Sequence, residues 1–502
     1  MATERHNRVG ADRCVCPDHR VCPPPGQATA PAPTPPFARL RAGSSRVGKG
    51  VRGLGSSHIC PPPTAEKCHD PYLRCALYGA AQTALGVRGC CLLSHSPQGC
   101  YQLVEAAFGW QDADYTETLT LCTKLCEDEI VHGGEEVLAR TILEAQQLQP
   151  PLMFVVSACG PEIVGDDIVA VCEDIASQVS FPIVPILCAG FRGDQNQGTD
   201  IALDAILRQL VTGNGDGRRI SRSLCLIAPH ANANPTWMGD LHWVKAVLAQ
   251  MGATVAATLT HDTAFADFER VPQAEGCLML SHDAGQRAAD YLAGHFGIEQ
   301  WCRELPLPIG FSNTRAWLTE LGERLGAEAM AQRLIAAGER MVVEVCRRKG
   351  LEQSAMHRAP AAIIADATVG IPLLRFIAED LEMIPELLCL RSGQAGTGEL
   401  LARELAELGL NAEVVYNADV YQVKTALAEA KPEMVFASNV ERHAVEELAI
   451  PFVFRLVNPI SRFRMTDRAY FGYTGMLNLI EDVQNDWLDR YRSKQRRYKA
   501  RW

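Results

Sequence analysis

The chain has 502 residues, and 48 lysines and arginines against 59 aspartates and glutamates give it a formal net charge of −11. This acidic balance offers no general attraction for nucleic acid or an anionic membrane, and 47% hydrophobic with 21% charged residues excludes a disordered or fibrous chain. Such a length corresponds to about three domains, which can build their cores without disulfides. The 19 cysteines therefore indicate metal binding, redox chemistry or buried thiols.

Residues 1–58 differ in composition from the rest of the chain. They include a proline-rich stretch from Pro23 to Pro36 and then a basic, glycine-rich stretch. Too few apolar side chains are present to offset the entropy of ordering, so we predict a disordered tail. Three cysteines lie in this tail and could form a metal site, but a fourth ligand at a suitable spacing is missing. We therefore favour a tail without a metal-binding role. The three cysteines are Cys14, Cys16 and Cys22.

The sequence predicts a protein of the cytoplasm that neither enters a membrane nor binds nucleic acid. Its longest apolar runs, such as Pro151–Ala158 and Ile183–Ala189, are shorter than the roughly 20 residues that a bilayer requires. The amino terminus lacks the apolar segment of a signal peptide. In a reducing compartment, cysteines at meaningful spacings hold metal more often than they form disulfides.

From Cys60 onward, short apolar runs alternate with helical patterns. Strands are predicted at residues 152–158, 183–188, 223–228, 254–259, 277–280, 361–366, 386–391, 412–417, 433–438 and 450–456, and helices at 165–179, 243–251, 371–381 and 398–409. Alternation of this kind indicates parallel sheets covered by helices on both faces. We therefore predict an α/β fold of three Rossmann-like domains over residues 59–218, 219–358 and 359–468. A carboxy-terminal helix within 469–502 is expected to pack on a partner or on the first domain.

Three cysteines stand beside small or turn-forming residues. They are Cys75, Cys100 and Cys159, with Gly79, Gly99, Gly160 and Pro161 near them. Glycines allow a backbone to approach a bulky inorganic group, and thiolates are preferred ligands of iron–sulfur clusters. Cys159 also follows a predicted strand, where α/β proteins bind ligands. Spacing alone is weak evidence, because the chain contains no CxxC near these positions.

The sequence around these cysteines resembles the nitrogenase component 1 family. The segments that carry the resemblance are His95–Cys100 (HSPQGC), Glu127–Gly134 (EDEIVHGG) and Cys159–Asp167 (CGPEIVGDD), in the family's order. The family has an HGxxGC turn, an acidic pair before a VFGG-like turn, and a cysteine followed by IGDD. The resemblance covers roughly residues 60–490 and implies the fold of that family.

Within the family, the chain resembles the β-type rather than the α-type subunit. Ser281 stands where an α-type chain has the cysteine that holds the active-site cofactor, and the segment Phe454–Val483 contains no histidine to serve as its second ligand. The segment also resembles the β-type ending. By this resemblance, Cys75, Cys100 and Cys159 correspond to the β-side ligands of an [8Fe–7S] P-cluster shared with the α-type subunit. The alternative is a simpler interfacial [4Fe–4S] cluster.

The resemblance also implies partners. These are an α-type subunit carrying an active-site iron–sulfur cofactor, in an α2β2 heterotetramer, and a homodimeric ATP-dependent iron–sulfur reductase that supplies electrons. The chain itself contains no GxxxxGK[ST] motif for ATP phosphates. The segment Leu119–Gly134 differs from the serine-rich segment of nitrogenase β chains. We therefore expect a nitrogenase-like reductase that cleaves C–S bonds of small methylthio compounds, as in the methylthio-alkane reductase group. The alternatives are a cofactor-assembly scaffold and a true nitrogenase β chain.

Several other residues have two interpretations each. Cys122 and Cys126 would share a face if their segment were helical and could form a metal pair, although packing is favoured. Cys188 is either an additional cluster ligand or, as favoured, a buried thiol. His95 either hydrogen-bonds near the cluster or stabilises a turn. The pair Asp166–Asp167 suggests acid–base chemistry or, as favoured, the start of a helix.

Overall fold

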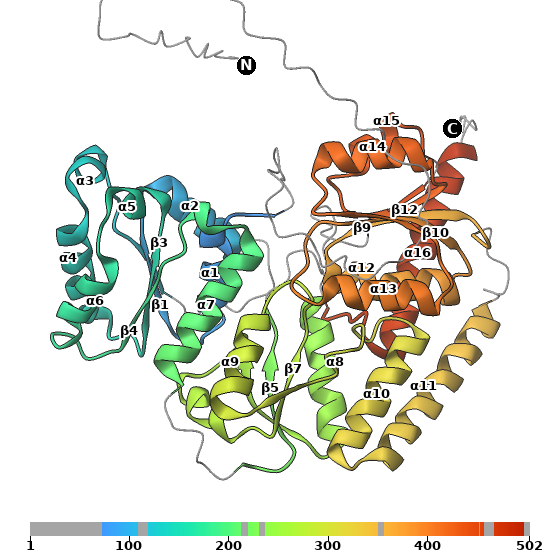
Figure 1. Cartoon of the computed structure of the whole chain (residues 1–502), viewed down its shortest axis with the longest axis horizontal. Helices are drawn as coiled ribbons and strands as arrows, with labels where there is room; N and C mark the ends of the chain where they lie inside the picture. Colours follow the sequence, from blue (N-terminus) through green and yellow to red (C-terminus); the bar gives the residue numbers. More distant parts are fainter. Residues whose placement is uncertain are drawn as a thin grey trace, which may run out of the picture. The chain divides into compact units, whose positions relative to one another are not determined.

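The computed structural model describes residues 73–108, 119–211, 219–229, 236–349, 356–450, 452–455 and 466–495. The predicted tail, with its three cysteines, lies outside these residues. The described residues belong to one compact unit, Ser57–Trp502. They form three parallel sheets flanked by helices, which confirms the predicted α/β fold (Figure 1).

The first sheet has the strand order β2-β1-β3-β4. Phe154 and Val156 join one hydrophobic core, whereas Met153 and Val155 join another. This alternation arises because successive side chains of a strand point to opposite faces. Helices α1 and α7 cover one face and α4 and α6 the other (Figure 1). The bounds are β1 Cys91–His95, β2 Leu119–Cys122, β3 Met153–Ser157, β4 Ile183–Ile186, α1 Ala76–Leu85, α4 Glu135–Ala145, α6 Ile168–Ala176 and α7 Gln195–Leu210.

Three further helices of this part follow strands or turns directly: α2 Gln98–Phe108, α3 Glu127–His132 and α5 Cys159–Val164.

The second sheet has the order β6-β5-β7-β8. Its strands are β5 Ser223–Ile227, β6 Thr254–Leu259, β7 Gly276–Met279 and β8 Glu299–Trp301, and its helices are α8 Trp237–Gln250, α9 Gln286–Phe296, α10 Phe311–Leu325 and α11 Glu328–Lys349.

The third sheet has the order β11-β10-β9-β12-β13. Its strands are β9 Pro360–Ala365, β10 Ile384–Leu390, β11 Glu413–Tyr416, β12 Met434–Ala437 and β13 Phe452–Arg455. The helices are α12 Ala367–Arg375, α13 Thr397–Glu407, α14 Val420–Ala430, α15 Arg442–Glu447 and α16 Gly472–Gln495.

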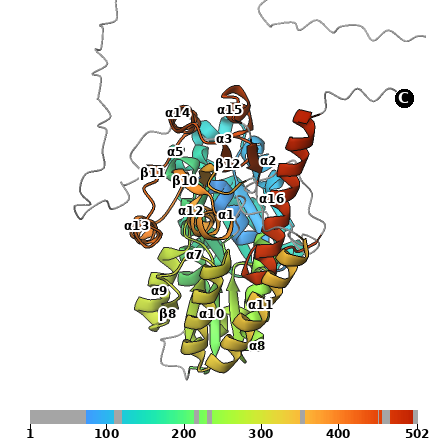
Figure 2. The same ribbon diagram turned by 90° about the vertical axis from the view of Figure 1, so that its right-hand side faces the viewer.

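The carboxy-terminal helix α16 packs against α10, α11 and β13. Figure 2 shows α16 running beside α11. Within the described residues, these contacts are with the second and third sheets and their helices and not with the first domain, which was one of the two expected neighbours. The reason is its apolar side chains: Met476, Leu479 and Val483 belong to the core shared by those two parts of the chain. Packing on a partner chain, the other expectation, stays a prediction.

Two observed elements differ from the expectations. Residues 119–122 form strand β2, where the sequence predicted no strand; a helix there was only the condition under which Cys122 and Cys126 would share a face. Helix α12 begins at Ala367 rather than at residue 371, directly after strand β9. Both differences have the same cause: a short segment that pairs with or packs on the sheet takes its conformation from its neighbours and not from its own residue pattern. In the described part of the chain, no helix is both long and apolar enough to span a bilayer.

Helices α1 and α7 approach each other closely through glycines. A Cβ atom on Gly79 would lie 1.8 Å from the carbonyl oxygen of Gln195, and one on Gly198 would lie 2.0 Å from that of Ala76. Because α1 follows Cys75 directly and α7 follows Asp194, this contact fixes where Cys75 lies relative to the loop after β4. An isolated backbone bridge pairs Cys75 with Asp194.

We expect Gly79→Ala to lower the free energy of unfolding by about 3 kcal/mol, because the added methyl group would force two helix backbones apart. Urea denaturation of the full chain would measure the change. The matched control is Gly294→Ala in α9, where a Cβ would meet no atom within 4 Å. It should be neutral or stabilising by about 0.5 kcal/mol. Equal unfolding midpoints for the two variants would contradict the prediction.

Candidate functional site

The carboxyl ends of β1 and β3 form the topological switch point of the first sheet. The chain leaves β1 to form β2 on one side and then returns to form β3 on the other. The register pairs His95 at the end of β1 with Ser157 at the end of β3. Open α/β sheets bind ligands at such points. Cys100 follows β1 in helix α2, and Cys159 follows β3 as the first residue of α5.

Cys75 and Cys159 both lie beside Gly190. The backbone N–H of Gly190 donates a hydrogen bond to Cys159 Sγ, at an N···S distance of 3.1 Å. A Cβ atom on Gly190 would lie 3.1 Å from Cys159 Sγ and 3.7 Å from Cys75 Sγ. Both sulfur atoms therefore face the same glycine, although 84 positions separate the two cysteines in the numbering (159 − 75).

Cys100 belongs to the same group. Burial raises the pKa of its half-buried thiol, and the neighbouring thiols of Cys159, Cys75 and Cys122 raise it further. The three cysteines that the sequence singled out lie near one another, because Cys75 and Cys159 meet at Gly190 and Cys75 and Cys100 border the same hydrophobic core. Among the described residues, no set of three or more His, Cys, Asp or Glu side chains has the arrangement of a site for a single metal ion.

Cys122 lies at the edge of this group. It ends strand β2, where its Sγ lies 3.4 Å from the carbonyl oxygen of Ser96 and accepts the N–H of Lys124 at 3.3 Å. Cys126 is exposed and precedes helix α3. The segment between them is not helical, so the condition for a pair on one helical face is not met.

Other thiols are buried in the core. Cys188 is fully buried, with its Sγ 3.6 Å from the carbonyl oxygen of Ser157, and burial raises the pKa of its thiol. These contacts agree with the interpretation of Cys188 as a buried thiol. Cys90 and Cys91 are likewise buried at the start of β1, and Cys172 is buried in α6.

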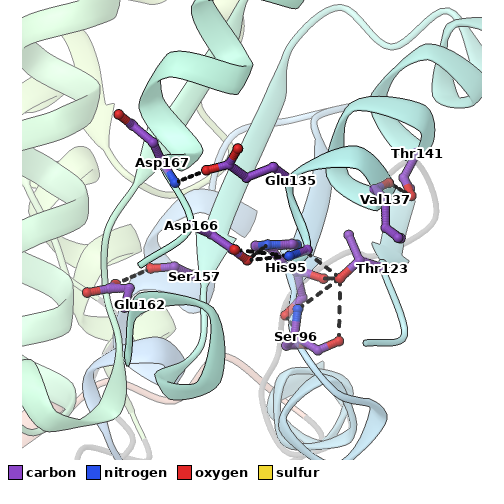
Figure 3. A network of polar contacts seen from close by, with 12 residues as sticks. His95, Ser96, Thr123, Glu135, Val137, Thr141, Ser157, Glu162, Asp166 and Asp167 are labelled. Carbon is purple, nitrogen blue, oxygen red and sulfur yellow. Dashed lines mark hydrogen bonds and ion pairs between the residues drawn. The ribbon is translucent and has the colours of Figure 1, made fainter. Parts of the chain in front are cut away.

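His95 and Asp166 form a buried network at the carboxyl end of β1 (Figure 3). His95 Nε2 lies 3.0 Å from Asp166 Oδ2, and Nδ1 lies 3.2 Å from the hydroxyl of Thr123. Asp166 also accepts the N–H of Gly134, at 2.9 Å and 3.1 Å to its two oxygens. Burial lowers the pKa of His95, an effect that the nearby Asp166 opposes. The network therefore ties the end of β1 to the turn between α5 and α6.

The two adjacent aspartates have different roles. Asp167 caps α6 by accepting the N–H of Ala170 at 3.0 Å, as predicted for a helix start. Asp166, predicted to do the same, instead holds His95 and Gly134. Its side chain is 3% exposed and that of His95 is fully buried, so both serve the structure of the site rather than contact with a substrate.

Glu162 is a residue of the site that the sequence did not reveal. Its carboxylate accepts hydrogen bonds from the hydroxyl of Ser157, from the N–H of Ala189 at 3.0 Å and from Arg192 Nε at 2.6 Å (Figure 3 shows the first). Glu162 lies in the CGPEIVGDD segment and Arg192 in the loop after β4. Their pairing was not predictable, because it depends on the approach of two loops from neighbouring strands.

Ser281 lies at the carboxyl end of β7, in a buried polar cluster between the second and third sheets. Its hydroxyl is 3.0 Å from that of Thr368 and accepts the N–H groups of Asp283 and Ala284 at 3.0 Å and 3.2 Å. The Asp283 carboxylate in turn accepts the N–H groups of Ala367 and Thr368, at the start of α12. The Ser281 hydroxyl is therefore hydrogen-bonded by one side chain and two backbone N–H groups of this chain.

Comparison with known proteins finds relatives that align with most of the chain. The chain is 25% identical over 456 residues to the nitrogenase molybdenum-iron protein beta chain of Methanococcus maripaludis, covering 84% of this chain and 95% of that one. It is 23% identical over 365 residues to the nitrogenase iron-molybdenum cofactor biosynthesis protein NifE of Bradyrhizobium diazoefficiens, covering 72% and 64%.

The fold is that of a solved structure of nitrogenase Cp1 at pH 6.5, with a TM-score of 0.71 and 19% identity over 84% of this chain and 94% of the other. Residues 75–488 match the family described as nitrogenase component 1 type oxidoreductase. That match begins at Cys75 and includes all three sheets and the cysteine group. The chain belongs to the nitrogenase component 1 type oxidoreductase family.

Proposed function

We propose that the chain is the β-type subunit of a nitrogenase-like reductase, in which Cys75, Cys100 and Cys159 ligate an iron–sulfur cluster shared with an α-type subunit. The observation that supports this proposal is that the three thiols lie near one another at the switch point of the first sheet. Thiolates are the preferred ligands of iron–sulfur clusters, and Gly190 leaves space between two of the sulfurs. When bound, the cluster would relay single electrons from an ATP-dependent reductase to the cofactor of the α-type subunit.

Three half-buried thiols from this chain would be half of the ligands of a cluster that two subunits share. This number favours a cluster held between two chains. We propose the [8Fe–7S] type in an α2β2 heterotetramer, with an interfacial [4Fe–4S] cluster as the alternative. The polar network around Ser281 supports the β-type assignment. Its hydroxyl is occupied by partners within the chain, so a cofactor ligand is not available where an α-type chain would have one.

For the substrate we propose small methylthio compounds, whose C–S bonds the complex would cleave reductively. This rests on the departure of residues 119–134 from nitrogenase β chains, which argues against dinitrogen as the substrate. A cofactor-assembly scaffold is the second candidate, and the similarity to the biosynthesis protein NifE favours it.

An exposed apolar surface lies beside the cysteine group. Its members are Val131 on α3, Ile163 and Val164 on α5, and Phe191 in the loop after β4. Val131, Ile163 and Phe191 are 70%, 73% and 59% exposed. Helices α3 and α5 contact each other, and α5 begins with Cys159. Because an electron donor must approach the cluster closely, we propose that the reductase docks on this surface.

Cys100→Ala is expected to remove the shared cluster and weaken assembly with the α-type subunit, because one of three thiolates from this chain is lost. The complex would be purified anaerobically with its partner, and iron counted and the EPR spectrum recorded. Cys346→Ala is the matched control, a half-buried thiol in helix α11. An unchanged EPR spectrum in Cys100→Ala would refute the assignment of this ligand.

Ile163→Asp is expected to abolish ATP-dependent electron delivery while the iron content and the association with the α-type subunit stay at wild-type levels. Desolvating a carboxylate against an apolar partner surface is unfavourable. Tyr421→Asp on α14, at a side chain with 76% exposure, is the control. Loss of the α-type subunit from the purified variant would instead assign the surface to the αβ interface.

Turnover distinguishes the candidate activities. With reductase and ATP, the complex should release methane or another hydrocarbon from a methylthio compound and should retain its cofactor through repeated cycles. A scaffold would transfer its cofactor to an acceptor protein without such turnover. Ammonia from dinitrogen at a comparable rate would show a true nitrogenase instead.

A further inference from the structure

The loop after β4, residues 188–193, is fixed to residues 157–162 by four hydrogen bonds. The N–H of Cys188 donates to the hydroxyl of Ser157 at 2.9 Å, and the N–H of Ala189 donates to Glu162 at 3.0 Å. The N–H of Gly190 donates to Cys159 Sγ at 3.1 Å, and Arg192 Nε donates to Glu162 at 2.6 Å. Three successive backbone N–H groups of the loop are therefore directed at residues 157–162.

Glu162 lies at the centre of these interactions. Its side chain is 6% exposed, and it receives a hydroxyl, a backbone N–H and a guanidinium. The Ser157 hydroxyl connects it to the N–H of Cys188. Glu162 thus contacts the loop on both sides of Gly190, through the backbone N–H of Ala189 before it and the side chain of Arg192 after it.

We propose that Glu162 is a positioning residue that directs the Gly190 N–H at Cys159 Sγ and thereby sets the reduction potential of the cluster, an inference that rests on the proposed ligand role of Cys159. Reduction adds negative charge to a cluster and its sulfur ligands. A hydrogen bond to a ligand sulfur stabilises the reduced form more than the oxidised form, which raises the potential. Glu162 does not contact the sulfur itself and acts through the loop.

The geometry also explains why residue 190 is a glycine. A Cβ there would lie 3.1 Å from Cys159 Sγ and 3.4 Å from Cys75 Cβ. The N–H can approach the sulfur closely only because nothing projects from the α-carbon toward the two cysteines. Glu162 and Gly190 therefore act together: one fixes the loop, and the other leaves the sulfur accessible to the N–H.

The test is an EPR-monitored redox titration of the anaerobically purified αβ complex. Glu162→Ala should lower the midpoint potential of the shared cluster and speed amide exchange of the peptide covering residues 188–193. Glu162→Gln keeps an acceptor for the Ala189 N–H and should shift the potential less. Arg192→Gln, which removes only the guanidinium, should also give a small shift. The control, Arg442→Gln, removes an ion pair of the same Nε–Oε geometry in α15 and should leave the potential unchanged.

The outcomes separate this inference from the proposed function. A wild-type complex without iron and without a cluster EPR signal would contradict the proposed function. A wild-type cluster together with Glu162 variants of unchanged potential would overturn the positioning role alone. Should Glu162→Ala lose its iron, the Glu162→Gln and Arg192→Gln complexes decide: wild-type potentials in both overturn the role, and lowered potentials support it.

Discussion

The parallel pairing of β1 with β3 is the constraint on which the cysteine site depends. Because the two strands run in the same direction and in register from Cys91–Met153 to His95–Ser157, the segments that follow them leave the sheet at the same edge. One segment carries Cys100 and the other Cys159. Another strand of the sheet, β4, pairs with β3 in parallel. The loop that follows β4 and contains Gly190 therefore leaves the sheet at the same edge. Cys75 joins them through the close packing of α1 on α7.

This edge is held by two polar networks with different partners. The His95–Asp166 network ties the end of β1 to the α4 and α6 starts, and the Glu162 network ties α5 to the loop after β4. The carboxylates of Asp166 and Glu162 are both buried, and buried carboxylates with several donors rigidify the segments that they join. A rigid frame lets thiols from three distant segments keep their mutual positions, as ligation of a cluster would require.

The carboxyl edges of the second and third sheets contrast with that of the first. There, Ser281, Asp283 and Thr368 bond one another and the first turn of α12. Asp283 belongs to the second part of the chain and Thr368 to the third, so this cluster joins the two parts. Side chains of the chain itself occupy the edge that, in the first sheet, is lined by thiols.

The sequence by itself determined the α/β class, most of the strands and the thiol chemistry of the candidate ligands. Long buried strands such as Met153–Ser157 and Pro360–Ala365 were recognisable because parallel strands covered on both faces require continuous apolar runs. The motifs around Cys100 and Cys159 identified the family, and the family match over residues 75–488 bears this out. Short elements such as Leu119–Cys122 were not recognisable, since pairing with β1 and not their own residues makes them strands.

Only the tertiary structure decided which side chains meet. The sequence could not show that Asp166 binds His95 rather than caps a helix, since both roles suit an aspartate before a helical segment. It could not show that Glu162 reaches Ala189 and Arg192, or that Cys75 and Cys159 both lie beside Gly190. Such contacts join segments that are far apart in the chain, and strand order fixes them. Residue type specifies what a side chain can bind, whereas the order of strands in the sheet specifies what lies within its reach.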